Sequence, residues 1–283
     1  MTIDDLASPQ PALIEVQARL SETTGRDLRG ASELSSALAT HFATEPTVIQ
    51  GRSGPFGRTP YDDDLEASRA VLQQAGALVA ERLDAGRRPI TLASDCALAL
   101  GTLPVIGARE PQSQILWLDA HTDFDTPATS TLSFLGSMSL AGATGQWDSG
   151  LGAIDPASVV HAGARFDPEA FDEAGHRQAE TSGMTIVEVA PDLVERALAA
   201  LGNSPVYVHL DPDVLDPSIY PIPYGRSGGL EGDQLVGLLG ALAARGPVLG
   251  IEVTAYHSAD DAAERASVTQ LLGEAVSAAL IRA

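Results

Sequence analysis

Short apolar runs alternate with longer amphipathic stretches through most of this chain, and this alternation constrains the fold more than any other feature. The runs are rich in Val, Ile, Leu or Tyr and lie at residues 90–93, 114–118, 158–162, 185–189, 206–210 and 248–253. The stretches with helical character lie at residues 32–43, 63–84, 168–181, 191–201, 231–244 and 260–281. Strands that alternate with helices favour a parallel sheet with helices on both faces. The sequence therefore predicts an α/β protein with three layers, αβα, around a central, mainly parallel sheet.

No shift in composition divides the 283 residues, so we expect a single domain at residues 11–283 after a flexible tail at residues 1–10. Hydrophobic residues make up 44% of the chain and charged residues 19%, which is typical of a globular protein. The first residues lack the pattern of a secretory signal, and no apolar stretch reaches the roughly 20 residues that cross a bilayer. Cys96 is the only cysteine, which excludes an intrachain disulfide and favours a cytoplasmic location.

The chain is strongly acidic, with 38 acidic and 17 basic residues and a formal net charge of -21. Such a charge repels nucleic acids and anionic membranes, so we expect neither as a partner. Cationic ligands, such as metal ions and guanidinium compounds, are compatible with it.

Two acidic clusters directly follow predicted strands, where open α/β sheets bind their ligands. The clusters comprise Asp119, His121 and Asp123 after one strand, and Asp211 and Asp213 after another. If the chain stays extended there, alternate side chains share one face. Either cluster alone is common in loops and caps, but the two together favour a metal site. Five such ligands suit two divalent ions with a bridging water activated as hydroxide.

These motifs resemble the signatures of the arginase/agmatinase (ureohydrolase) family. Residues 119–127 (DAHTDFDTP) are similar to its D-A-H-x-D signature, and residues 209–217 (HLDPDVLDP) to S-x-D-x-D-x-x-D-P. Residues 250–253 (GIEV) resemble the segment whose glutamate holds the guanidinium group, and residues 93–97 (ASDCA) occupy the place of G-G-D-H-S. The resemblance implies an arginase-like fold, hydrolysis of a linear amidine, two Mn²⁺ ions, a small-molecule guanidino substrate and a homo-oligomer that is a trimer or hexamer.

The resemblance also assigns roles to individual residues. The metal ligands would be Cys96, Asp119, His121, Asp123, Asp211 and Asp213. The catalytic residues would be Asp123, which moves a proton of the bridging hydroxide, and Glu252, which pairs with the guanidinium group through both carboxylate oxygens. Substrate contacts would come from Asp125, Ser133, Asp167 and Glu252, the first three at positions where the family binds the α-groups of an amino acid.

Three positions depart from the family pattern. Cys96 replaces a histidine ligand, and because a thiolate is softer and must lose a proton, the ion beside it would bind weakly or be another divalent metal. Gly136 stands where the family has a histidine that shuttles a proton to the leaving amine. His209 replaces a serine and is a candidate supporting residue or substitute shuttle. The plainer alternatives are that Cys96 is a small buried residue and His209 a structural one.

These departures favour a branch that resembles N-hydroxy-L-arginine amidinohydrolases, which form L-ornithine and hydroxyurea in antibiotic biosynthesis. A hydroxyguanidine is less basic than a guanidine and is the easier electrophile, so it needs less help from the metal site. The alternatives are an ordinary arginase, agmatinase or guanidino-acid hydrolase that releases urea, and an inactive metal-binding relative that serves as a subunit or regulator. A zinc-dependent deacetylase is disfavoured because the sequence has no His-His pair.

Overall fold

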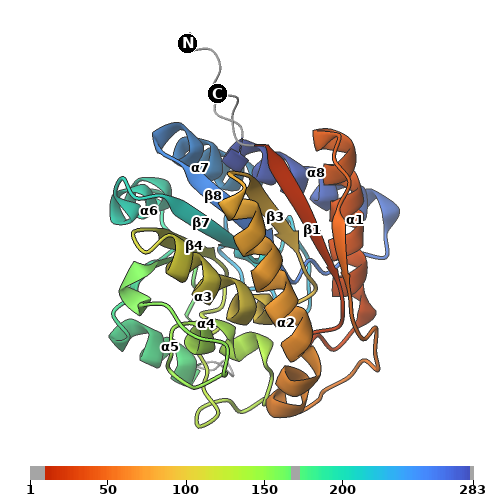
Figure 1. The fold of residues 1–283 in the computed structure, drawn as a ribbon. Helices are drawn as coiled ribbons and strands as arrows, with labels where there is room; N and C mark the ends of the chain where they lie inside the picture. Colours follow the sequence, from red (N-terminus) through yellow and green to blue (C-terminus); the bar gives the residue numbers. More distant parts are fainter. Residues whose placement is uncertain (1–9, 167–172, 281–283) are drawn as a thin grey trace.

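A computed structural model of the chain describes residues 10–166 and 173–280 (Figure 1). All but the last residue of the predicted tail at residues 1–10 therefore lie outside the described residues, as does Asp167. None of the described helices is both long enough and apolar enough to cross a membrane.

Eight parallel strands form one sheet in the order β2-β1-β3-β8-β7-β4-β5-β6. The strands are β1 (Pro11–Gln17), β2 (Thr47–Gln50), β3 (Arg88–Leu92), β4 (Gln114–Leu118), β5 (Val159–Ala162), β6 (Thr185–Val187), β7 (Val206–Leu210) and β8 (Val248–Val253). The observed β4, β7 and β8 have the bounds that the sequence predicts. The strands β1 and β2 were not predicted.

Helices cover both faces of this sheet (Figure 1). One layer contains α1 (Gly25–Phe42), α6 (Leu193–Leu201), α7 (Gly232–Arg245) and α8 (Ala262–Leu280). The other contains α2 (Tyr61–Asp84), α3 (Ala99–Arg109), α4 (Ser139–Ala143) and α5 (Glu173–Thr181). The structure thus confirms the predicted three-layer α/β fold, in which α3 is a helix that the sequence did not indicate.

The central strands are buried on both faces because alternate side chains enter the two helical layers. In β4, Leu116 and Leu118 pack into the core beneath α7 and α8, whereas Ile115 and Trp117 enter the core beneath α2 and α3. This double burial explains why the strand is an almost unbroken apolar run. It also fixes the point at which the chain leaves the sheet, directly before the first acidic cluster.

A row of polar and aromatic side chains crosses the middle of the sheet on the face of α2 and α3. The register aligns Thr91 of β3, Glu252 of β8, His209 of β7, Trp117 of β4 and His161 of β5. Each of these five residues has an exposed fraction of 0%. This central row lies beneath the carboxyl ends of the strands, where the acidic clusters are located.

Candidate metal centre

The acidic clusters adopt tight turns rather than the extended conformation that we expected. Asp211 accepts a hydrogen bond from the backbone N–H of Asp213 at 2.8 Å, which begins the 3-10 helix Pro212–Val214. Asp119 accepts one from the backbone N–H of His121 at 2.7 Å. An aspartate that bonds to the backbone two residues later favours a turn over an extended chain. The turns nevertheless bring the two clusters together.

His121 and Asp213 join the two clusters directly. His121 Nδ1 lies 2.8 Å from Asp213 Oδ2, and the backbone N–H of Ala120 donates to Asp213 Oδ1 at 2.9 Å. Asp119, His121 and Asp213 each offer a ligand atom, and these atoms lie within 4.8 Å of one another. They form one group of side chains with the spacing of a metal site.

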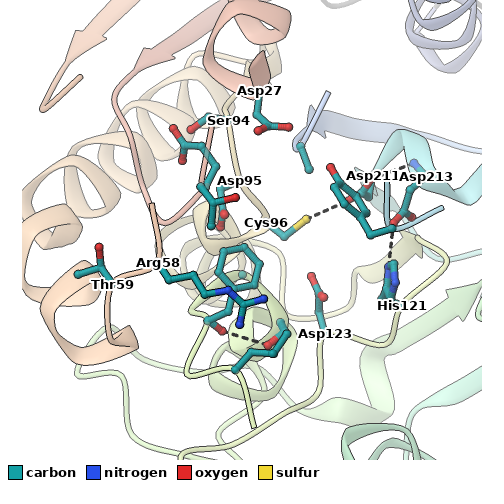
Figure 2. Close-up of a pocket in the computed structure, with 18 residues that line it drawn as sticks. Asp27, Arg58, Thr59, Ser94, Asp95, Cys96, His121, Asp123, Asp211 and Asp213 are labelled. Atoms are coloured by element: carbon teal, nitrogen blue, oxygen red, sulfur yellow. Dashed lines mark hydrogen bonds and ion pairs between the residues drawn. The ribbon is translucent and has the colours of Figure 1, made fainter. Parts of the chain in front are cut away.

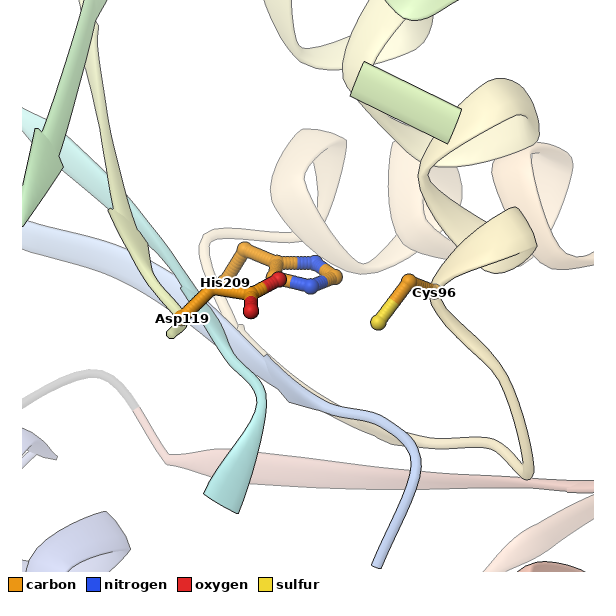
Figure 3. Close-up of side chains that lie close together, drawn as sticks. All are labelled: Cys96, Asp119 and His209. Carbon is orange, nitrogen blue, oxygen red and sulfur yellow. The ribbon is translucent and has the colours of Figure 1, made fainter. Parts of the chain in front are cut away.

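Cys96 approaches the same region from the segment after β3. Its Sγ lies 3.2 Å from Asp211 Oδ2 and 3.2 Å from Thr254 Oγ1. Cys96, Asp119 and His209 form a second group whose ligand atoms lie within 4.8 Å of one another (Figure 3). Because both groups contain Asp119, they are adjacent.

Asp123 has a left-handed backbone conformation, with φ 47°. Its carbonyl oxygen accepts hydrogen bonds from the first N–H groups of α4, at Leu140 and Ala141, and Ser139 Oγ donates to its carboxylate at 3.2 Å. A non-glycine residue in this region usually has a positional reason. Here the start of α4 fixes the direction of the Asp123 carboxylate.

All the predicted ligands except Asp119 line one cavity of about 250 Å³. Cys96, His121, Asp123, Asp211 and Asp213 line it and point toward a common region (Figure 2). Asp119 is not among the lining residues and is 1% exposed. All six side chains that the sequence predicts as ligands thus lie together at the carboxyl edge of the sheet.

The carboxylates in this cluster repel one another. Burial, followed by repulsion from Asp213, raises the pKa of Asp119, Asp123 and Asp211 well above the ordinary value. Burial and then Asp211 raise the pKa of the Cys96 thiol. Burial also acts to raise the pKa of Asp213, but the neighbouring His121 and the N–H of Ala120 outweigh it and lower that pKa to about 2.

The cluster therefore has the chemistry of a cation site. Buried carboxylates at this density are stable only if they take up protons or bind positive charge. Carboxylate oxygens with one imidazole and one thiolate suit a divalent transition metal. Two adjacent groups that share Asp119 fit a pair of such ions.

Glu252 differs from our expectation of a direct substrate contact. It is 0% exposed, does not line the cavity, and accepts hydrogen bonds from Thr102 Oγ1 at 2.7 Å, Tyr207 OH at 3.1 Å and His209 Nδ1 at 2.7 Å. As part of β8, its side chain faces α3 beneath the site. The residue after β8 that lines the cavity is Ala255.

Two further predicted substrate contacts also lie away from the cavity lining. Asp125 is 1% exposed and accepts a hydrogen bond from Ser137 Oγ at 3.3 Å. Ser133 Oγ accepts one from the backbone N–H of Tyr61 at the start of α2. Neither lines the cavity, and Asp167 lies outside the described residues.

His209 lies beneath the predicted metal ligands, in the central row. Its ring stacks on Trp117 with centroids 3.4 Å apart and planes 3° apart. Its Nδ1 bonds to Glu252, and its Nε2 lies 3.2 Å from Thr254 Oγ1, which in turn contacts Cys96. This geometry favours the supporting role that the sequence suggested for His209, in which it positions Cys96 through Thr254.

Gly136 lies against the side chain of Phe134. A Cβ atom at Gly136 would be 2.6 Å from the Phe134 ring and 3.1 Å from Asp95 Oδ1. Both Phe134 and Gly136 line the cavity. The Phe134 ring therefore occupies part of the space that a longer side chain at position 136 would need to reach the site.

Sequence reasoning missed several cavity-lining residues, most of which come from loops far from the signatures. They include Glu22, Thr23, Asp27, Arg58, Phe134 and Tyr224. Arg58 belongs to the segment at residues 51–60, which is rich in Gly, Pro and Arg. A basic residue in a loop of such an acidic chain was the one signal available.

Comparisons with known proteins agree with this architecture. The model of the Arginase family matches residues 21–281. A Streptomyces lavendulae protein named N(omega)-hydroxy-L-arginine amidinohydrolase is 28% identical over 255 residues, which cover 90% of this chain and 91% of that protein. An arginase of Brucella melitensis is 36% identical over 150 residues, 47% of this chain and 48% of that protein. Among solved structures, an arginase from Bacillus subtilis superposes with a TM-score of 0.80 at 21% identity, covering 97% of this chain and 99% of that one.

Proposed function

This chain belongs to the arginase family, and from that premise we propose that it hydrolyses the hydroxyguanidino group of N-hydroxy-L-arginine to give L-ornithine and hydroxyurea. The observation that carries the proposal is that Cys96, His121, Asp123, Asp211 and Asp213 line a single acidic cavity, with the buried Asp119 close to His121 and Asp213. The match to the Streptomyces lavendulae amidinohydrolase over most of both chains supports the choice of substrate.

The ligand set fits two divalent ions, for which we propose Mn²⁺ because carboxylates dominate it. Such a pair supplies a hydroxide nucleophile near neutral pH by lowering the pKa of a bound water. Cys96, Asp119, His121, Asp123, Asp211 and Asp213 would hold the ions. The thiolate of Cys96 would make its side of the centre softer than an imidazole would.

The remaining chemistry belongs to the residues of the cavity. Its acidic lining attracts a cationic substrate and holds the reacting carbon near the ligands. Asp123, fixed by α4 and Ser139, would receive the proton of the nucleophile and return it to the leaving nitrogen of ornithine. Glu252 would act from beneath the site, by orienting His209 and with it Thr254 and Cys96.

Two departures favour a hydroxyguanidine over a guanidine. Phe134 occupies the space next to Gly136, so a histidine shuttle from that position has no room. Cys96 replaces an imidazole ligand. A hydroxyguanidine is less basic and needs less assistance with proton transfer, so it tolerates both changes.

A substrate panel tests the proposal. Protein reconstituted with Mn²⁺ should release hydroxyurea from N-hydroxy-L-arginine with a kcat/KM at least tenfold above that for urea release from arginine, agmatine or a guanidino acid. A clear preference for arginine would instead identify an ordinary arginase. Absence of turnover on every substrate, with metal bound, would identify an inactive relative that acts as a subunit or regulator.

The assembly and location of the protein are also proposals. Likeness to the family favours a homo-oligomer, a trimer or a hexamer, which light scattering coupled to size-exclusion chromatography would measure. We propose a cytoplasmic enzyme of antibiotic biosynthesis, in keeping with the single cysteine of the sequence. Fractionation of the producing cells tests the location.

A further inference from the structure

The cavity has a second end, away from the predicted ligands, with its own polar groups. Arg58 and Thr59 lie on the side of the cavity opposite Asp211, Asp213 and His121 (Figure 2). Six lining residues are acidic: Glu22, Asp27, Asp95, Asp123, Asp211 and Asp213. Arg58 is the only arginine or lysine among the described lining residues. A single cationic side chain among six acidic ones suggests a specific role for Arg58.

Arg58 is available to bind a ligand. Within residues 10–166 and 173–280 its guanidinium group has no hydrogen bond or ion pair, and the side chain is exposed on the cavity (Figure 2). The planar fork of an arginine binds a carboxylate through two parallel hydrogen bonds. The group that best complements this end of the cavity is therefore a ligand carboxylate.

Glu22 offers the opposite charge in the same cavity. It is 4% exposed, and its Oε2 accepts a hydrogen bond from the backbone N–H of Leu20 at 2.9 Å. Its Oε1 is buried and has no hydrogen-bond partner in the described part of the chain. Burial, followed by repulsion from Asp95, raises the pKa of Glu22 to about 8. An ammonium group placed here would complete the hydrogen bonding of Glu22 and favour its ionised form.

The buried side chain of Arg19 connects the segments that contain Glu22 and Arg58. Arg19 Nε donates to the backbone carbonyl of Glu22 at 3.0 Å, and Arg19 Nη2 donates to Gly57 O at 3.0 Å and Thr59 Oγ1 at 3.2 Å, the two neighbours of Arg58. Arg19 Nη1 pairs with Asp64 of α2 at 2.7 Å, and both side chains are 0% exposed. One cation thus ties the loop after β1 to the loop before α2.

From this arrangement we propose that Arg58 and Glu22 form a subsite for the head group of an α-amino acid, in which Arg58 binds the α-carboxylate and Glu22 the α-ammonium. The proposal rests on the function proposed above and names the residues that would favour an amino acid over a decarboxylated amine such as agmatine. It also assigns head-group recognition to loops other than those of Asp125 and Ser133, which lie away from the cavity lining.

Paired ligands that differ by one group test this subsite without turnover. Ornithine and putrescine differ in the carboxylate, and ornithine and 5-aminopentanoate differ in the α-ammonium. Calorimetry on the Mn²⁺-loaded protein should show that Arg58→Gln weakens ornithine binding by roughly ten- to a hundredfold and putrescine binding by less than about twofold. Glu22→Gln should weaken ornithine binding but not 5-aminopentanoate binding.

The controls separate this subsite from the fold and from the proposed reaction. Arg82→Gln, a substitution at the far end of α2 where Arg82 pairs with Glu81, should bind all three ligands like the wild type. Thermal unfolding shows whether each variant is folded. Equal losses for both members of a pair, no loss, or a wild type that does not distinguish them would overturn the subsite. If such a result is accompanied by hydroxyurea release, the proposed reaction remains supported without the subsite. If the protein distinguishes ornithine from the other ligands but hydrolyses no substrate, only the subsite remains supported.

Discussion

At the scale of single residues, the carboxylates of the cluster differ in what they do beyond carrying charge. Asp211 begins a turn and contacts Cys96, whereas Asp123 points into the cavity from a backbone held by α4. We expect Asp123→Ala and Asp211→Ala each to lower kcat/KM at least a thousandfold, because each removes a predicted ligand of the two metal ions. Circular dichroism should show a retained fold, and metal analysis should show less than two Mn²⁺ per chain. Full activity in either variant would contradict the assignment.

Gly136 permits a second prediction at this scale. Gly136→His should destabilise the protein by roughly 1–3 kcal/mol, because its Cβ overlaps the Phe134 ring. It should not increase the release of urea from arginine. Adding Phe134→Ala should recover part of the stability lost, with Phe134→Ala alone as the control. Denaturant unfolding measures these differences, and a Gly136→His protein as stable as the wild type would show that the ring moves freely.

At the scale of elements, the central row makes Glu252 a structural support for the site. Glu252→Gln replaces a carboxylate oxygen, which can only accept hydrogen bonds, with an amide NH₂ group, which donates them. This group would face the donors Thr102, Tyr207 and His209. We expect the free energy of unfolding of the metal-free protein to fall by roughly 1–3 kcal/mol. Glu274→Gln, on the exposed face of α8, is the matched control. A raised KM with unchanged stability would support the direct substrate contact that the sequence suggested.

The same scale shows which elements a sequence can predict. Strands β4, β7 and β8 are buried on both faces, so their sequences are mostly apolar and have sharp ends, although β7 contains His209 and β8 contains Glu252. In contrast, β1 contains Glu15, whose carboxylate is satisfied by Ser32 of α1 and Gln17, contacts that no local pattern reveals. Helix α3 contains Pro104 and was not predicted, because proline and glycine disfavour helices. A Cβ at Gly101 would lie 2.2 Å from Leu72 O, so glycine there permits close packing of α2 on α3.

Chain topology also explains which site residues could be predicted. The predicted Asp and His ligands directly follow the strands β4 and β7, and both their chemistry and their place in a parallel sheet are local properties. Arg58 and Glu22 belong to two loops far apart in the sequence, which Arg19 connects by hydrogen bonds. The register of β8 in the sheet determines that the side chain of Glu252 faces α3. None of these contacts has a local sequence signal.

At the scale of the whole molecule, the buried acids make stability depend on pH and metal together. In the metal-free protein the pKa values of Asp119, Asp123 and Asp211 are raised, and that of Glu22 is about 8. The folded state then holds more protons than the unfolded state, so stability falls as pH rises toward these values. Chelator-treated protein should have a lower Tm at pH 8.5 than at pH 6.5.

Bound metal should reverse this trend. Cations replace the protons of the carboxylates, and their binding strengthens as the ligands ionise. With Mn²⁺ present, Tm should therefore be at least as high at pH 8.5 as at pH 6.5. His161, whose pKa burial lowers to about 4, is neutral in the folded state throughout this window but loses its proton near pH 6.5 in the unfolded state, so it adds only a small rise in stability at the lower end of the window. Differential scanning calorimetry measures both series, and parallel trends with and without metal would contradict the cation site.

The lone cysteine gives the centre an optical signature of its own. Its sulfur is the one soft donor among oxygen and nitrogen donors, so cobalt in place of manganese would display a sulfur-to-metal charge-transfer band in the near ultraviolet. No other thiol exists in the chain to produce that absorption. Spectral titration could thus count how many equivalents of cobalt are added before the sulfur becomes coordinated, and so reveal the filling order of the two positions.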